Sequence, residues 1–369
     1  MKGVELQITH DEVILLVNEA VMAGIDSIQI GYPFLGLDLM TLNPDEFVIS
    51  DVISFDRYAE CTPQVDPAIS REIPGFSEMK HALISAGVME LTGWDETKKE
   101  LLRISEEPQN VHTSRRKSYV TVDTNILYFR VVSRRMNPPS SLCIHHGVVD
   151  PRELSWVISD VVVNEIDKRI RDKYRKEHIE MLKRLNSGHL AERLMNMSTL
   201  STRTAKCAFL DLHEILGRLG AFRIRCREFP QNKEERDILI ARTLRMFEEE
   251  RDCDILLLSA DEDMLFHARD NGISCYVLHV PHVTVDWARL TPETCAHLIR
   301  DLAVTYGCIS LKGTGIVVYG EWTGMTSSNW MNEDLMLWVE EGARILPPLK
   351  RSLKVSRAIR SRFPREGMH

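Results

Sequence analysis

The sequence lacks the features that mark secreted, disulfide-bonded and membrane-spanning proteins. Its eight cysteines are scattered and none forms a Cys-x-x-Cys pair, so the common zinc-finger patterns are excluded. No apolar run is long enough to cross a bilayer, and the first ten residues lack the basic and apolar segments of a secretory signal. We therefore expect reduced thiols, a cytoplasmic location and no membrane partner.

Charge is distributed unevenly along the 369 residues. The net charge is −8, but residues 1–110 carry 7 basic and 20 acidic side chains, whereas residues 111–369 carry 39 and 34. The net charges of these two parts are therefore −13 and +5. The acidic first part repels a polyanion and the remainder can approach one, so the distribution leaves nucleic-acid binding open.

Composition and periodicity predict three domains. Residues 1–107 are expected to form a small acidic α/β domain of unknown role, and residues 108–117 a polar linker. Residues 118–282 alternate strands with helices, which is the pattern of a parallel sheet with crossover helices. Residues 283–369 are expected to form a small α+β extension that ends in a basic tail.

Hydrophobic periodicity also predicts the elements within these domains. In the central domain we expect helices at 161–171, 234–250 and 261–271, and strands at 119–122, 156–158, 222–226, 255–258 and 275–278. In the first domain we expect helices at 11–23, 76–86 and 96–105, and strands at 4–8, 27–30 and 47–55. In the last we expect a hairpin of residues 306–311 and 316–322, and helices at 291–303 and 332–341.

Five carboxylates of the central domain are expected to converge at one edge of its sheet. Two of them follow strands and three lie in the first turns of helices, where the carboxyl ends of parallel strands meet: Asp123, Glu165, Asp237, Asp261 and Asp263. Carboxylates this close repel one another and need a cation. A set of oxygen ligands without His or Cys suits Mg²⁺ or Mn²⁺, which points to phosphate-ester chemistry.

Four segments carry a resemblance to a known family. Residues 122–125, 163–167, 237–244 and 257–263 resemble, in order, the four acidic motifs of the PIN-domain nucleases, over roughly residues 118–282. The resemblance implies a three-layer α/β/α domain with a central parallel sheet. It implies a Mg²⁺- or Mn²⁺-dependent endoribonuclease that hydrolyses RNA with metal-activated water. It also implies a catalytic quartet with Asp263 as a further metal ligand and Thr124 or Asn125 as accessory groups: Asp123, Glu165, Asp237 and Asp261.

Other readings of the sequence remain open beside this one. A PIN-like scaffold without turnover would bind RNA or a protein, and a structure-specific DNA nuclease would use the same acidic chemistry. Arg130, Arg134 and Arg135 follow Asp123 by two to three turns of an expected helix and are candidate substrate contacts. The N-terminal domain is a candidate surface for a homodimer or a protein partner.

Overall fold

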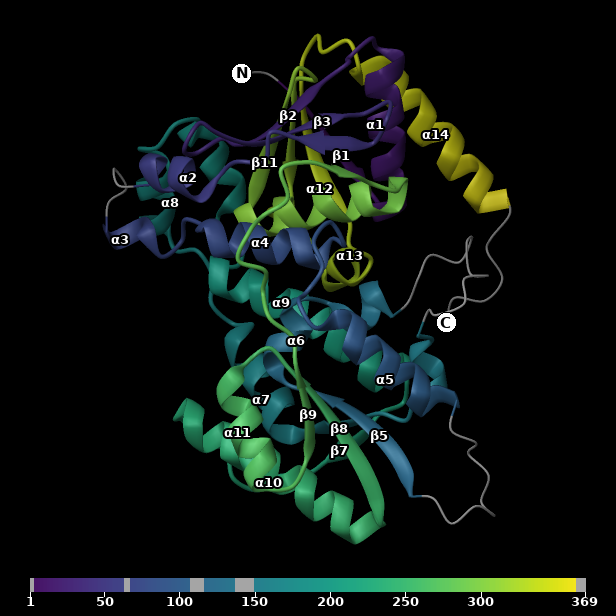
Figure 1. The fold of residues 1–369 in the computed structure, drawn as a ribbon. Helices are drawn as coiled ribbons and strands as arrows, with labels where there is room; N and C mark the ends of the chain where they lie inside the picture. Colours follow the sequence, from purple (N-terminus) through teal and green to yellow (C-terminus); the bar gives the residue numbers. More distant parts are fainter. Residues whose placement is uncertain (1–2, 63–66, 107–115, 137–148, 363–369) are drawn as a thin grey trace. The chain divides into compact units, whose positions relative to one another are not determined.

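A computed structural model describes residues 3–62, 67–106, 116–136 and 149–362. The chain divides into two compact units, each built from discontinuous segments. The antiparallel unit comprises residues 1–88, 173–200 and 284–369, and the parallel unit comprises residues 89–172 and 201–283. Figure 1 follows the chain through both. Residues 108–115, most of the expected linker, lie outside the described residues.

The antiparallel unit is built on one eight-stranded sheet in which every strand pair is antiparallel. In spatial order its strands are β1 (Gly3–Ile8), β13 (Leu335–Glu340), β12 (Ile316–Tyr319), β11 (Cys308–Lys312), β2 (Ile28–Tyr32), β3 (Leu37–Asn43), β4 (Val48–Ser50) and β10 (Ala288–Arg289). The predicted N-terminal domain and C-terminal extension therefore share a sheet, because β1 pairs with β13 over its whole length.

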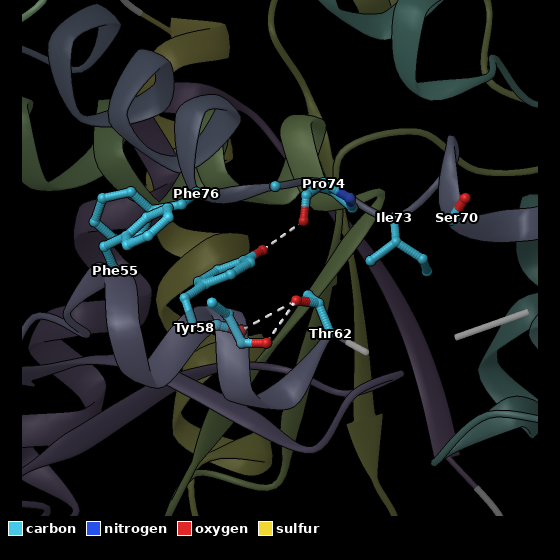
Figure 2. A pocket seen from close by; sticks show the side chains of 9 residues that line it. Phe55, Tyr58, Thr62, Ser70, Ile73, Pro74 and Phe76 are labelled. Carbon is cyan, nitrogen blue, oxygen red and sulfur yellow. Dashed lines mark hydrogen bonds between the residues drawn. The ribbon is translucent and has the colours of Figure 1, made fainter. Parts of the chain in front are cut away.

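Helices of this unit pack around α12 (Pro292–Tyr306), which contacts α1 (Val13–Met22), α4 (Phe76–Ser85) and β11. The Tyr306 hydroxyl lies 3.1 Å from that of Tyr58, which donates to the Pro74 carbonyl beside Phe76 (Figure 2). Its other helices are η1 (His10–Glu12), α2 (Phe55–Cys61), α3 (Pro67–Ser70), α8 (Lys176–Leu182), η4 (Gly188–Leu194), α13 (Ser327–Met331) and α14 (Leu346–Arg362).

Two elements of the antiparallel unit differ from the sequence prediction. The helix predicted at 332–341 is wrong, because residues 335–340 form β13 between β1 and β12. Hydrogen bonds to two neighbouring strands favour the extended backbone here, and no local pattern reveals them. The strand predicted at 47–55 is cut short at Ser50, because Ser54 caps α2 by accepting a hydrogen bond from the Arg57 backbone.

The parallel unit contains β5 (Lys117–Val122), β8 (Cys253–Ser259) and β9 (Ser274–Val277) as one parallel sheet, and β6 (Val157–Ser159) with β7 (Phe222–Ile224) as a parallel pair. A bridge between Val120 and Trp156 joins the two, so that the spatial order is β7, β6, β5, β8, β9. The predicted α/β character and parallel sheet are thereby confirmed, and the three-layer PIN-like arrangement stays a prediction.

Helices connect these strands in the order expected of crossover connections. They are α6 (Thr124–Tyr128), α7 (Asp160–Arg169), α9 (Leu200–His213), α10 (Lys233–Arg251) and α11 (Glu262–Asp270), with the short η3 (Pro151–Glu153), η2 (Val131–Arg135) and η5 (Glu214–Arg218). The predicted helix at 96–105 is α5 (Trp94–Glu106) and belongs to this unit. Strand order reverses between β5 and β8, which is where ligands bind in open α/β sheets. Among the described residues, no helix is both long and apolar enough to cross a membrane.

Candidate functional site

Asp123 leaves β5 and caps the first turn of α6. Its Oδ1 accepts a 2.6 Å hydrogen bond from the Thr124 backbone, and its Oδ2 accepts from Asn125 Nδ2 at 3.2 Å and from Ser259 Oγ at 3.0 Å. The residue is only 3% exposed. All three donors are neutral, so the carboxylate is oriented without being paired to a cation.

Burial and the nearby carboxylate of Asp237 raise the pKa of Asp123 to about 7. Asp237 lies in the first turns of α10 and is 8% exposed. Burial likewise raises the pKa of Asp237 to about 6; Asp261 and Glu165 act in the same direction, against Lys233 and Arg236. Asp237 accepts no hydrogen bond from the described residues, so its oxygens remain available to a ligand.

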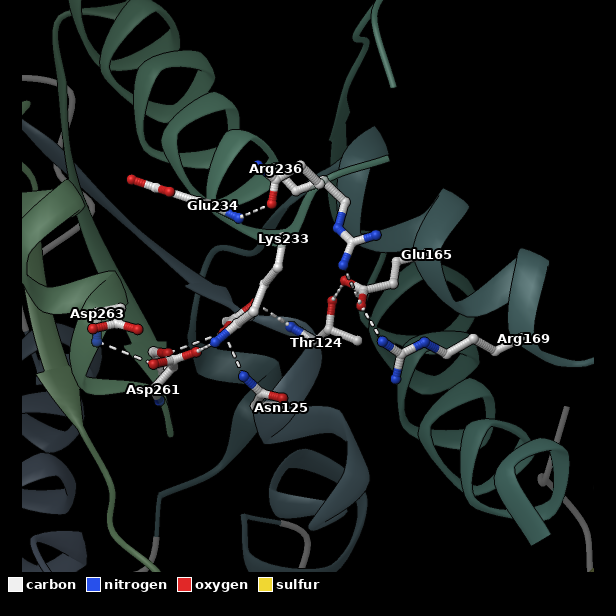
Figure 3. Close-up of polar contacts among 12 residues, drawn as sticks. Thr124, Asn125, Glu165, Arg169, Lys233, Glu234, Arg236, Asp261 and Asp263 are labelled. Carbon is white, nitrogen blue, oxygen red and sulfur yellow. Dashed lines mark hydrogen bonds and ion pairs between the residues drawn. The ribbon is translucent and has the colours of Figure 1, made fainter. Parts of the chain in front are cut away.

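Glu165 lies on α7 and is held by three side chains from three helices. Its Oε2 accepts a 2.8 Å hydrogen bond from Thr124 Oγ1, and its Oε1 lies 2.8 Å from Arg169 Nη2 and 3.6 Å from Arg236 Nη2. Figure 3 shows this carboxylate between the two guanidinium groups. The Thr124 hydroxyl therefore joins α6 to α7.

Asp261 follows β8 and caps α11 by accepting a 3.0 Å hydrogen bond from the Asp263 backbone. Its Oδ2 forms an ion pair with Nζ of Lys233, the first residue of α10, and Figure 3 shows the Lys233 side chain extending toward Asp261. The Ser259 hydroxyl accepts from the Asp261 backbone at 3.0 Å while donating to Asp123. Ser259, one position before Ala260, thus links the two strand ends. The side chain of Asp263 is exposed.

A cavity of about 60 Å³ lies between these elements. Its lining combines three of the predicted carboxylates with both accessory residues and three cations: Asp123, Glu165, Asp237, Thr124, Asn125, Arg169, Lys233 and Arg236. The cations were not predicted from the sequence, although helical spacing contained the signal. Arg169 follows Glu165 by four positions, and Lys233 precedes Asp237 by four, so each faces the same side as its acid.

The three arginines predicted to contact substrate do not line this cavity. Arg130 is 5% exposed and interacts with the buried Asp211. Arg135 donates to the Met89 carbonyl and lies 3.8 Å from Glu90. Arg134 is half-buried at the end of η2. The chain leaves the helical path at Arg130, whose φ is +53°, so the extended helix that would have aimed these side chains is interrupted.

The residues present fit a hard divalent cation in chemistry, although two of the carboxylates are ion-paired with basic side chains. In the ranges that the structure describes, no three His, Cys, Asp or Glu side chains are grouped closely enough to hold a metal ion as they stand. Asp261 is paired with Lys233, and Glu165 is paired with Arg169 and Arg236. Asp123 and Asp237 line the cavity and offer carboxylate oxygens, which are the ligands that Mg²⁺ and Mn²⁺ prefer.

Comparison of the chain with protein-family models, with curated proteins and with solved structures gave no match. The geometry described above is therefore the basis for a functional proposal.

Proposed function

We propose that the chain is a Mg²⁺- or Mn²⁺-dependent nuclease that hydrolyses phosphodiester bonds, with RNA as its substrate. The observation that carries the proposal is the pair Asp123 and Asp237. Both are buried beside one cavity, the charge of Asp237 disfavours ionisation of Asp123, and neither accepts a hydrogen bond from a cationic side chain among the described residues. Such an arrangement costs free energy at neutral pH unless a bound cation compensates it.

The other two carboxylates complete a plausible ligand set once their basic partners are displaced. Asp261 is within electrostatic range of Asp237, and so is Glu165. A bound divalent cation supplies positive charge to the scissile phosphate and lowers the pKa of a water nucleophile. Ser259 and the Thr124 backbone hold the Asp123 carboxylate in one orientation, which preserves the geometry that a metal ligand needs.

The basic side chains in the cavity support a phosphate substrate. Lys233, Arg169 and Arg236 line the same cavity as the carboxylates, and each forms an ion pair with one of the predicted acids. When a cation binds the carboxylates, these groups are released to bind phosphate oxygens, for which a guanidinium offers two parallel donors. RNA as the substrate rests on the resemblance of the four acidic segments to the PIN-domain nucleases.

The test is cleavage of a labelled single-stranded RNA by the full chain with Mn²⁺, Mg²⁺ or EDTA. We expect cleavage with either cation and none with EDTA. Asp123→Asn and Asp237→Asn should each lower the rate by more than about 100-fold, because even the partners that orient metal ligands account for roughly 10- to 100-fold. Asp270→Asn, an exposed acid at the end of α11, is the matched control and should retain the parental rate.

Two outcomes would contradict the proposal. Parental cleavage by Asp123→Asn would remove the assigned site from the reaction. RNA binding without cleavage in either cation would identify a binding scaffold instead of an enzyme. Single-stranded DNA of the same sequence serves as the comparison substrate, and faster cleavage of the DNA would overturn the assignment of RNA.

A further inference from the structure

The C-terminal helix α14 (Leu346–Arg362) has an unusual charge. It contains six basic residues and no acidic residue: Lys350, Arg351, Lys354, Arg357, Arg360 and Arg362. Leu349 and Leu353 are buried, and the helix contacts α1. The inward face is therefore fixed by apolar packing, and the basic residues are distributed around the rest of the helix.

Two of the six cations are used within the antiparallel unit. Arg357 donates to Glu12 at 2.8 Å and to the Gln7 carbonyl at 2.6 Å, and Arg360 lies 3.4 Å from Asp11. Glu12 is 1% exposed, so its ion pair with Arg357 satisfies a buried charge. These two arginines hold α14 against the start of α1 and have a structural role.

The other four cations have no acidic partner within the described parts of the chain. At 100° per residue, Arg351, Lys354 and Arg362 lie on the face opposite Leu349 and Leu353, and all three are exposed. Arg351 and Arg362 are eleven positions apart, which corresponds to about 16 Å along the helix. Three unpaired cations are thus presented along one outward face.

We propose that this outward face of α14 binds the phosphate backbone of a nucleic acid. The inference rests on the proposed nuclease function for the identity of the polyanion, and on charge complementarity for the surface. The cations have no acidic partner to release, so binding phosphates costs them only solvation and side-chain entropy. Asp11 and Glu12, two of the acids of residues 1–110 that lie beside α14, are already paired with Arg360 and Arg357.

An anionic membrane is the competing partner for a basic amphipathic helix, and the exposed apolar area argues against it. Val355 and Ile359 are the large apolar side chains exposed on α14, at 53% and 54%. The two leucines that would insert into a bilayer are buried in the protein. Membrane binding by interfacial helices needs a broad apolar face as well as charge.

The test compares two variants of the full chain in EDTA, so that binding is measured without cleavage. The first carries Arg351→Gln, Lys354→Gln and Arg362→Gln, and the second carries Arg357→Gln and Arg360→Gln. The probe is a fluorescent single-stranded oligouridylate, titrated at several salt concentrations. Losing three phosphate contacts should weaken binding by roughly 10- to 100-fold near 0.1 M salt and reduce the slope of log K against log salt by about 2.

The second variant should keep the parental salt slope, provided circular dichroism shows that it is folded. An unchanged affinity and slope in the first variant would overturn the proposal. Tighter binding of the parental chain to phosphatidylserine vesicles than to the oligouridylate would overturn it as well. A failure of the nuclease function gives a different result. In that case the parental chain still binds the oligouridylate through α14 but does not cleave RNA in Mn²⁺ or Mg²⁺.

Discussion

Replacing Asp123 with Asn should change the stability of the parallel unit in a way that depends on pH. Asp123 has a folded-state pKa of about 7 against an ordinary value of 3.8. The native state therefore binds a proton more tightly than the unfolded state. The stabilisation that comes from this proton is lost as pH rises from the ordinary pKa of 3.8 through the folded-state pKa of about 7. The difference corresponds to a cost on the order of 4 kcal/mol for the ionised carboxylate above pH 7.

The neutral Asn side chain avoids this cost but weakens the hydrogen bonds at the site. Its oxygen can still accept from the Thr124 backbone, whereas its amide nitrogen replaces the oxygen that accepts from Asn125 and Ser259. That loss is about 1–3 kcal/mol and is the same at every pH. Between pH 5 and pH 8, the stability of the variant relative to the parent should therefore rise, by roughly 3 kcal/mol.

Urea unfolding at pH 5 and pH 8, followed by pulsed hydrogen exchange of the peptide spanning residues 117–128, reports on the parallel unit itself. Ser259→Ala is the matched control, because it keeps the carboxylate and removes only a hydrogen bond that lowers the pKa of Asp123, so its stability should still fall between pH 5 and pH 8. Addition of Mg²⁺ at pH 8 should stabilise the parent and leave Asp123→Asn unchanged. A relative stability that is the same at both pH values would refute the argument that burial and Asp237 disfavour ionisation of Asp123.

Two further predictions concern the groups that hold the carboxylates. Ser259→Ala should destabilise the parallel unit by about 1–2 kcal/mol, because the hydroxyl both donates to Asp123 and accepts from the Asp261 backbone. The same variant should lower the cleavage rate by roughly 10-fold. Cleavage at the parental rate would show that the link between the strand ends is dispensable. Lys233→Gln should lower the dissociation constant of Mn²⁺ in calorimetric titrations, because the ammonium group competes with the metal for Asp261. The control Lys176→Gln on α8 should leave the dissociation constant unchanged. Weaker Mn²⁺ binding in Lys233→Gln would contradict this competition.

The parallel unit was largely predictable from the sequence because its signals are local. β5 and β8 are short apolar runs, each followed by an acid that caps a helix, and Asp capping is a preference of the residue itself. Once the strands are parallel neighbours, the register places Asp123 next to Ser259 without further information. The placement of Asp123, Glu165 and Asp237 around one cavity therefore follows from sequence pattern and strand direction.

The strand order of the antiparallel unit was not predictable, because several of its strands pair with partners that are distant in the sequence. Nothing in residues 3–8 or 335–340 indicates that these segments pair with each other across most of the chain. The excursion of residues 173–200 into this unit is equally invisible to periodicity. The directions of the Arg134 and Arg135 side chains were also not predictable, because the left-handed backbone of Arg130 redirects the segment that follows it.

The balance of charge in the cavity separates a metal site from an ordinary salt-bridge cluster. Glu165 and Asp261 are compensated by basic side chains, as in many structural ion-pair networks. Asp123 and Asp237 form no ion pair with a basic side chain among the described residues, although both are buried and their charges repel. A structural network would gain stability from pairing these two acids, so the presence of two buried acids without an ion pair beside a cavity favours a role that needs negative charge there. Under the proposed function, the basic partners of Glu165 and Asp261 are counter-ions that a bound divalent cation would displace toward phosphate.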